Sequence, residues 1–320
     1  MCGKPRYAYD EESATKAISE PAWDILDRGG KRWRPVLLFL VAQALGGSVE
    51  QVQDLVVICE VVHNGTLLVD DIEDDSKVRR GKECVHLLFG VDVAINAGNA
   101  MYYLPTVVLK QLKGKVPDEQ LLKAYEMYCQ ELLNLHFGQG YDIWWHKGNG
   151  KPTVEQYLQM CAYKTGTLAR LSAKLSALFA GGTAEQVEAL SKFAETVGVG
   201  FQIQDDILNL VGAKLAETKG QYGEDIHEGK RTLMVLHCFQ RAPAEEAHRL
   251  EEILNSHPTD QTIINEAIEI IERNGGITYA REKAREIVLG AWKDVEGVLP
   301  PSEAKDKLKA FADFLVEREI

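Results

Sequence analysis

Helical periodicity runs through most of this chain and leaves little room for a β-sheet. Apolar residues recur at steps of three and four, the spacing of one helix face, while the strict alternation of a strand is scarce. Most of these segments are apolar over more than one face, which is typical of helices packed inside a bundle. We therefore predict an all-α fold, a single domain over residues 1–320, with helices at residues 36–45, 52–69, 94–112, 121–135, 157–178, 187–210, 233–239, 263–271, 279–298 and 304–316.

Turn residues separate the predicted helices. Gly46-Gly47, Gly181-Gly182 and Pro300-Pro301 fall between helical segments, as expected for chain reversals. Thr153, followed three residues later by Gln156, predicts a capping box at a helix start. Residues 212–230 form one longer irregular stretch, and loops of this length are often lids over active sites.

Composition narrows the class of protein. The formal charge of −12 argues against a nucleic-acid-binding protein, although local basic groups can still attract an anionic substrate. The six cysteines include no C-x-x-C pair, which disfavours a zinc site. We expect no signal peptide and no membrane span, because no run approaches 18 apolar residues, and hence a cytoplasmic enzyme.

Two acidic clusters each follow apolar sequence, which distinguishes them from a solvated acidic tail. The first, at residues 70–75, places five carboxylates in six residues, and the second opens with the pair Asp205-Asp206. Residues four apart share a helix face, so Asp70 projects together with Asp74. Like charges at that spacing repel, which predicts a counter-ion. Oxygen ligands without nearby cysteine favour Mg²⁺, which binds through one or two carboxylates plus substrate phosphates.

Four basic elements accompany the acids. Taken alone, one basic cluster is most often a solvated surface, but Arg forks and Lys charges are also the usual means of holding phosphate. Together with the acidic clusters they indicate Mg²⁺ bridging carboxylates to a diphosphate. The elements are Lys31-Arg32 with Arg34, then Lys77 with Arg79-Arg80, then Lys164, and finally Lys219 with Lys230.

In order and spelling, these motifs resemble those of the trans-isoprenyl diphosphate synthases, also called polyprenyl synthetases. The resemblance covers about residues 29–240, with C-terminal helices continuing to residue 320, and it is closest to the geranylgeranyl diphosphate branch. It implies a helix bundle around a central apolar cavity, Mg²⁺-dependent condensation of isopentenyl diphosphate with an allylic diphosphate, and a homodimer or higher homo-oligomer. The matching segments are residues 31–35, 63–74, 79–81, 134–140, 164–166, 201–206 and 224–230.

The resemblance also implies roles for individual residues. Asp70, Asp74 and Asp205 would hold three Mg²⁺ ions, with Asp71 and Asp206 as weaker ligands or network partners. These five aspartates and Lys164 form the expected catalytic set. Isopentenyl diphosphate would contact Lys31, Arg34, His63 and Arg80. The allylic diphosphate would contact Arg79, Lys164, Thr165, Gln202, Lys219 and Lys230.

Two positions bear on these roles and on product length. Asn209 stands where many relatives carry a third aspartate, so we expect it to be a poor metal ligand beside Asp205. Gly65 and Thr66 precede Asp70 by about one helical turn and are small, so a growing chain would pass them. By the resemblance, the floor that limits the product to twenty carbons would be formed by Tyr102, Tyr103 and His136.

Other functions stay open at this point. A farnesyl or longer-chain synthase would share every motif except the floor. A class I terpene cyclase would share the fold and the first aspartate motif, and a non-catalytic partner subunit would typically have lost one motif. The strings Glu60-x-x-His63 and Glu245-x-x-His248 have the spacing of di-iron ligands, although we expect no such site.

Overall fold

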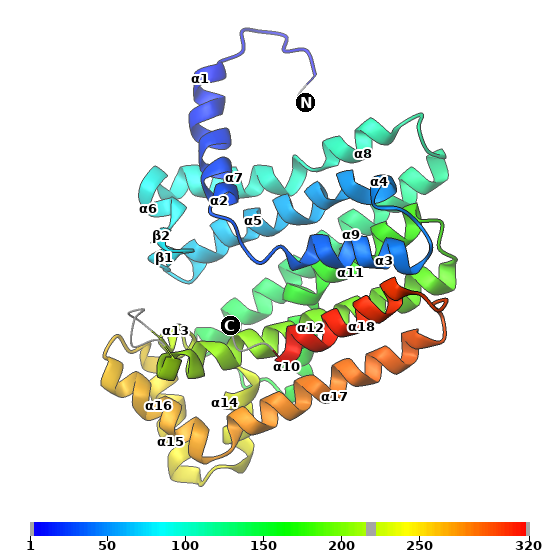
Figure 1. The fold of residues 1–320 in the computed structure, drawn as a ribbon. Coiled ribbons are helices and arrows are strands. Elements are labelled where there is room, and N and C mark those ends of the chain that lie inside the picture. Colours follow the sequence, from blue (N-terminus) through cyan, green and yellow to red (C-terminus); the bar gives the residue numbers. More distant parts are fainter. Residues whose placement is uncertain (1–2, 216–221, 318–320) are drawn as a thin grey trace. The chain divides into compact units, whose positions relative to one another are not determined.

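Helices account for nearly all of the regular structure, which confirms the all-α prediction (Figure 1). The computed structural model describes residues 3–215 and 222–317, and for residues 212–215 it describes the backbone alone. In that part of the chain the sheet content is one two-stranded antiparallel hairpin, β1 (Val78–Arg79) with β2 (Lys82–Glu83). No helix of the described residues is both long and apolar enough to cross a bilayer.

The chain divides into two compact units, which are described separately. The first comprises Met1–Cys129 and Leu171–Thr183, and the second comprises Gln130–Arg170 and Ala184–Ile320. The predicted motifs fall into both units: the Asp70 cluster lies in the first and the Asp205 cluster in the second.

The first unit is built around helix α5, which ends in the first acidic cluster. A buried core formed by Ile25, Leu68, Ala97 and Met101 joins α5 to α2 and α7. The elements up to the long helix α9 are α1 (Glu11–Ala14), the π-helix η1 (Thr15–Ser19), α2 (Glu20–Asp27), α3 (Trp33–Ala44), α4 (Val49–Val52), the 3₁₀-helix η2 (Gln53–Leu55), α5 (Val56–Glu73), α6 (Val85–Phe89), α7 (Val91–Tyr103) and α8 (Thr106–Leu112).

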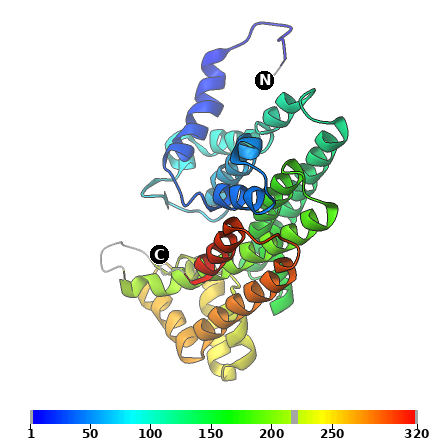
Figure 2. The same ribbon diagram turned by 45° about the vertical axis from the view of Figure 1, so that its right-hand side comes forward.

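Helix α12 is the corresponding central element of the second unit and carries the second acidic cluster. It runs beside α17 in both ribbon views (Figures 1 and 2). Thr153 and Gln156 form the predicted capping box at the start of α10. Two helices pass between the units along the chain: α9 (Asp118–His146) begins in the first unit and ends in the second, and α11 (Thr167–Phe179) begins in the second and ends in the first. The other elements of the second unit are α10 (Val154–Cys161), the π-helix η3 (Ala162–Gly166), α12 (Ala184–Leu215), α13 (Glu224–His227), α14 (Leu233–Arg241), α15 (Ala244–Ser256), α16 (Gln261–Arg273), α17 (Gly276–Glu296) and α18 (Glu303–Glu317).

Three sequence predictions need correction. The helix predicted over residues 94–112 is two helices, because the backbone turns at Pro105, whose ring is compatible only with the start of α8. Residues 212–230 are not one irregular loop: α12 continues to Leu215, and α13 begins at Glu224. The N-terminal helices α1 and α2 were not predicted, since polar residues interrupt the apolar periodicity over Glu11–Asp27.

Close glycine contacts fix how α5 packs on α7. A methyl group on Gly65 would lie 2.7 Å from Cβ of Met101 and 2.9 Å from the carbonyl oxygen of Gly98. A methyl group on Gly98 would in turn lie 3.0 Å from the carbonyl oxygen of Gly65. Both helices therefore approach each other at a point where neither tolerates a side chain, and Gly65 has a packing role just before the aspartates.

Candidate active site

The first acidic cluster lies at the C-terminal end of helix α5. Asp74 is the C-cap, and its backbone N–H donates to the carbonyl oxygen of Asp70 at 2.9 Å. The two residues therefore lie one helical turn apart, as predicted, and both are partly exposed. This end of the helix therefore carries two partly exposed carboxylates on one face.

Asp71 points into the protein instead. Its side chain is fully buried, and Oδ1 accepts a hydrogen bond from Nε of Arg79 at 2.7 Å. Burial alone would lower the pKa of the Arg79 guanidinium, but the charges of Asp71 and Asp70 more than offset this and raise it. Asp70 is farther away, 3.9 Å from the Arg79 guanidinium. Asp71 is thus a partner of Arg79 rather than a group presented to solvent.

A tight hairpin turn places the two predicted arginines. Arg80 and Gly81 join β1 to β2 with φ values of +53° and +77°, the left-handed pair of a type I′ turn. Arg80 then donates to Oδ1 of Asn64 at 3.0 Å and to the carbonyl oxygen of Ile25 at 3.1 Å. The motif Arg79-Arg80-Gly81 therefore folds back onto α5 and α2.

The residues predicted for isopentenyl diphosphate come together in part. Burial and the guanidinium groups of Arg34 and Arg80 lower the pKa of His63 well below its usual 6.5, so these three side chains share one electrostatic environment. Lys31 is exposed at the entry to α3. His63 is neutral at physiological pH, and the positive charge of this cluster comes from arginine.

Arg32, the remaining cation of that segment, has a structural partner. It occupies the N-cap of α3 with φ of +50° and pairs with Glu60 at 2.5 Å. Arg28, from α2, donates to the carbonyl oxygen of Arg79 at 3.1 Å. Arg28 was missed in the sequence because nothing in its spacing reveals a contact fifty-one residues along the chain.

The second acidic cluster shows the same division between a solvent-facing and a buried aspartate. Asp205 is partly exposed, whereas Asp206 is only 6% exposed. Oδ2 of Asp206 accepts from the Tyr157 hydroxyl at 2.6 Å, and Oδ1 accepts from the Gln202 amide at 2.8 Å. Burial raises the pKa of Asp206 to about 6, although both hydrogen bonds oppose the rise.

Asn209 has a local structural contact. Its side-chain oxygen accepts from the backbone N–H of Asp225 at 3.1 Å, and its carbonyl oxygen accepts from the N–H of Gly223. Asn209 thereby ties the start of α13 to α12.

The predicted allylic contacts of the second unit lie on and near a π turn. Lys164 and Thr165 belong to η3, and the Thr165 hydroxyl donates to Oε1 of Gln202 at 2.6 Å. Nζ of Lys164 pairs with Asp142 at 2.6 Å. A methyl group on Gly138 would lie 2.3 Å from the Lys164 amide nitrogen, so α9 can approach this turn only through a glycine.

Lys230 is held by acids of its own segment. It pairs with Asp225 at 3.5 Å and with Glu228. Burial raises the pKa of Asp225 to about 7, against the opposing charge of Lys230. Lys219 lies outside the described residues. Asp142 and Asp225 were not assigned roles from sequence, although Asp225 stands in the recognised segment 224–230 and Asp142 lies two residues after the recognised segment 134–140.

The chain-length residues are found in different environments. Tyr102 is buried, and its ring lies 3.3 Å from the position of a Gly65 methyl group. Thr66 is partly buried and donates to the carbonyl oxygen of His63. Tyr103 is 69% exposed, and His136 is exposed with its ring against the carbonyl oxygen of Leu132. Their role in the floor stays a prediction.

The chemistry of the donors in each unit fits Mg²⁺. Asp70 and Asp74 in the first unit, and Asp205 in the second, carry carboxylates at partly exposed positions, whereas Asp71 and Asp206 are buried. Within residues 3–215 and 222–317 no group of three His, Cys, Asp or Glu side chains is arranged to hold an ion by itself. Mg²⁺ does not require such a cage, because it keeps waters and binds substrate phosphates.

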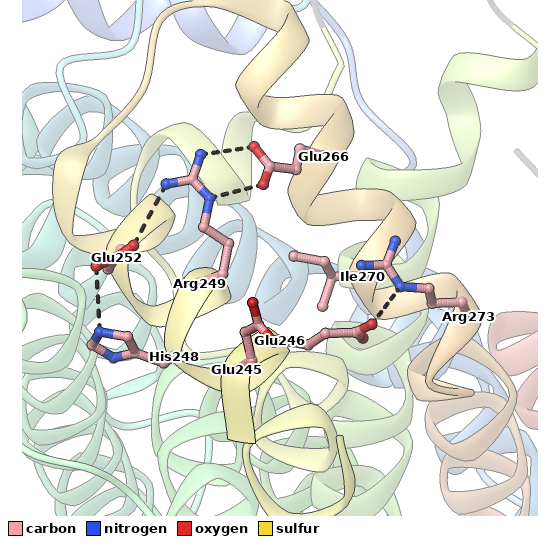
Figure 3. A pocket seen from close by; sticks show the side chains of 8 residues that line it. All are labelled: Glu245, Glu246, His248, Arg249, Glu252, Glu266, Ile270 and Arg273. Carbon is pink, nitrogen blue, oxygen red and sulfur yellow. Dashed lines mark hydrogen bonds and ion pairs between the residues drawn. The ribbon is translucent and has the colours of Figure 1, made fainter. Parts of the chain in front are cut away.

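The two Glu-x-x-His strings, at residues 60–63 and 245–248, have other contacts in the structure. Glu60 is occupied by Arg32, as above. His248 points to Glu252 at 3.3 Å in a shallow pocket between α15 and α16, where Arg249 binds Glu266 and Arg273 binds Glu246 (Figure 3). These are ion pairs on a solvated face, as the sequence indicated for this helix.

Comparison with known proteins agrees with the motifs. Residues 15–271 match the polyprenyl synthetase family. A short chain isoprenyl diphosphate synthase of Methanothermobacter thermautotrophicus is 34% identical over 92% of this chain and 88% of its own length. The crystal structure of a geranylgeranyl pyrophosphate synthetase from Pyrococcus horikoshii superposes with a TM-score of 0.85 at 32% identity, covering 95% of this chain and 90% of that one.

A further solved structure includes ligands. The geranylgeranyl pyrophosphate synthase of Corynebacterium glutamicum, solved in complex with isoprenyl diphosphate and magnesium, has a TM-score of 0.85 at 25% identity, covering 95% of this chain and 91% of that one. The chain described here belongs to the polyprenyl synthetase family. It is an isoprenyl diphosphate synthase, and thus a prenyltransferase.

Proposed function

We propose that this protein condenses isopentenyl diphosphate with an allylic diphosphate and that its main product is the twenty-carbon geranylgeranyl diphosphate. The observation that carries the proposal is the end of α5, where Asp70 and Asp74 lie one turn apart and Asp70 lies 3.9 Å from the Arg79 guanidinium. That arrangement suits a metal-bridged diphosphate, because the carboxylates can hold Mg²⁺ while the guanidinium binds phosphate oxygens.

The residues of this chain bind and orient the two diphosphates. Asp70, Asp74 and Asp205 would hold Mg²⁺, three ions by family resemblance, and Mg²⁺ when bound neutralises the diphosphate so that it can leave. Arg79, Lys164, Thr165, Gln202, Lys230 and the undescribed Lys219 would contact the allylic diphosphate. Arg34, Arg80, Lys31 and the neutral His63 would hold the isopentenyl diphosphate.

The reaction then needs three changes in bonding. The allylic carbon–oxygen bond breaks, and the electron pair leaves with the diphosphate. The double bond of isopentenyl diphosphate attacks the allylic carbon, and a proton leaves the adjacent carbon to form the new double bond. We propose that the departed diphosphate accepts that proton, since the basic residues around it are protonated cations and His63 is held neutral among arginines.

Product length is the finer part of the proposal. Tyr102 lies against the buried stretch of α5 just before the aspartates, where a growing chain would extend. We therefore assign the floor first to Tyr102, with Tyr103 and His136 beside it. The similarity to geranylgeranyl and short-chain synthases supports a product of this size.

Product analysis tests both levels of the proposal. The protein is incubated with Mg²⁺, labelled isopentenyl diphosphate and each allylic primer of five, ten or fifteen carbons. A dominant twenty-carbon product supports the floor, and Tyr102→Ala should then lengthen it. A fifteen-carbon or much longer product would retain the enzyme class and refute the floor. Absence of incorporation with every primer would refute elongation and favour a non-catalytic partner subunit.

We also propose a homo-oligomer. Helix α7 exposes Val91, Ile95 and Tyr103 along one face at steps of four and eight residues, and a second copy is the partner that the family resemblance favours. Light scattering of the purified protein would measure the mass directly. Ile95→Glu should release monomers, whereas a monomeric wild-type protein at micromolar concentration would refute the proposal.

A further inference from the structure

A chain of hydrogen bonds in the second unit connects four side chains. The Thr165 hydroxyl donates to Gln202, the Gln202 amide donates to Asp206, and the Tyr157 hydroxyl donates to the other oxygen of Asp206. Tyr157 and Thr165 come from α10 and η3, on either side of Lys164. Gln202 and Asp206 lie one turn apart on α12, on either side of Asp205.

Tyr157 is the least expected member of this chain. It is 1% exposed and packs in the main core of the unit, with Ile203 and Ile207. Burial raises the pKa of its hydroxyl well above 10, so the group remains a hydrogen-bond donor at every working pH. Nothing in the sequence marked it, because a tyrosine at an apolar helical position is indistinguishable from an ordinary core aromatic.

The geometry restricts what Asp206 can do. Both carboxylate oxygens already accept from protein donors, and the side chain is buried. Each oxygen keeps a second lone pair, but the two hydrogen bonds fix the orientation of the carboxylate, and its burial restricts the approach of a hydrated metal ion. Asp205, the adjacent residue on α12, is partly exposed.

We propose that Tyr157 is a positioning residue for the second aspartate pair. Its hydroxyl holds Asp206 against α10, so that only Asp205 of the pair is presented to the metal, and it sets α12 in register with the turn that carries Lys164 and Thr165. This inference rests on the proposed function, because it assumes that Asp205 and Lys164 act on one metal-bound diphosphate.

The test uses Tyr157→Phe, which retains the ring and removes only the hydroxyl. Tyr128→Phe is the matched control, because Tyr128 is also buried and its hydroxyl donates to a backbone carbonyl oxygen, that of Tyr102. Calorimetry measures binding of inorganic pyrophosphate in the presence of Mg²⁺, and steady-state kinetics follow in parallel. We expect Tyr157→Phe to weaken pyrophosphate binding about tenfold and to lower kcat more than it raises KM for isopentenyl diphosphate, as for a lost hydrogen bond to a charged group.

A double-mutant cycle with Asp206→Asn distinguishes positioning from a merely structural role. If the hydroxyl acts through Asp206, the double variant should bind pyrophosphate no more weakly than the weaker single variant. Independent, multiplying effects would overturn the proposal, as would wild-type binding by Tyr157→Phe. Should Tyr157→Phe not fold, Asp206→Asn alone decides: the proposal requires weakened binding with Asp205 intact. A wild-type protein that binds no Mg²⁺–pyrophosphate would instead refute the proposed function.

Discussion

The two aspartate pairs share the spelling Asp-Asp-Ile, but the protein stabilises their second members differently. Asp71 is buried against a cation, the guanidinium of Arg79. Asp206 is buried against two neutral donors, the Tyr157 hydroxyl and the Gln202 amide. In both pairs the first aspartate is partly exposed and the second is an internal anchor.

The difference shows that one sequence motif can serve two electrostatic arrangements. A carboxylate beside a guanidinium is stabilised as an anion, and its loss leaves a positive charge without a partner. A carboxylate held by neutral donors remains costly to ionise, and burial accordingly raises the pKa of Asp206 to about 6. Asp71 is therefore held mainly by a charge pair, and Asp206 mainly by hydrogen bonds from neutral donors.

The largest expected effect is a loss of kcat on substitution of the first aspartate of each pair, Asp70 or Asp205. Asp70→Asn and Asp205→Asn should each lower kcat about 10³-fold, because several kcal/mol of metal-dependent stabilisation are lost, with little change in melting temperature. Asp75→Asn is the matched control, since Asp75 lies in the same acidic cluster but is exposed and pairs with Lys77. Comparable loss of kcat in the control would show that cluster charge, rather than position, matters.

The second members should differ from each other in stability. Asp71→Asn leaves Arg79 without its anion and should cost about 3 kcal/mol of unfolding free energy, whereas Asp206→Asn should cost about 1 kcal/mol. Because the folded pKa of Asp206 is raised from 3.8 to about 6, its ionised form destabilises the native state, and the cost of Asp206→Asn should be smaller at pH 8 than at pH 5. Chemical denaturation at both pH values measures these free energies of unfolding. An equal loss of unfolding free energy in Asp71→Asn and Asp206→Asn would contradict the proposed difference between the two aspartates.

A packing substitution tests whether the first pair depends on its helix contact. Gly65→Ala should destabilise the protein by about 2 kcal/mol, because a methyl group would press on Met101 and on the Gly98 carbonyl oxygen. Gly140→Ala is the control: nothing lies within 4 Å of its methyl position, so a change of at most about 1 kcal/mol, in the stabilising direction, is expected. Thermal melts of the two variants suffice, and equal melting temperatures would contradict the close contact.

The smallest expected effect is a pH dependence in the first unit. The folded pKa of His63 lies well below its usual 6.5, so the unfolded chain takes up a proton that the folded one does not. Its contribution to stability is therefore fully present above pH 6.5 and is lost as pH falls below it, by up to about 1.4 kcal/mol per pH unit. His63→Gln should flatten the stability profile between pH 6.5 and 5, whereas an unchanged slope would argue against the arginine environment.

Sequence reasoning identified the helices and most of the motif residues because both are local. Heptad-like spacing reports the buried face of a helix, and the pair Asp70 with Asp74 follows from helix geometry alone. The roles of Asp71 and Asp206 could not be separated in this way, since their partners Arg79 and Tyr157 are eight and forty-nine residues away. The same holds for the close contact of Gly65 with Gly98 and Met101 on α7, which no local pattern reveals.

One measurement tests the division of labour within the two pairs most directly. The Asn variants of Asp70, Asp71, Asp205 and Asp206 are each titrated with inorganic pyrophosphate in Mg²⁺, and each is melted without ligand. We expect the Asp70 and Asp205 variants to lose binding at an unchanged melting temperature, and the Asp71 and Asp206 variants to lose stability while binding is reduced far less. An Asp206 variant that melts as the wild type does but no longer binds pyrophosphate would contradict the account, because Asp206 would then be a metal ligand and not an anchor.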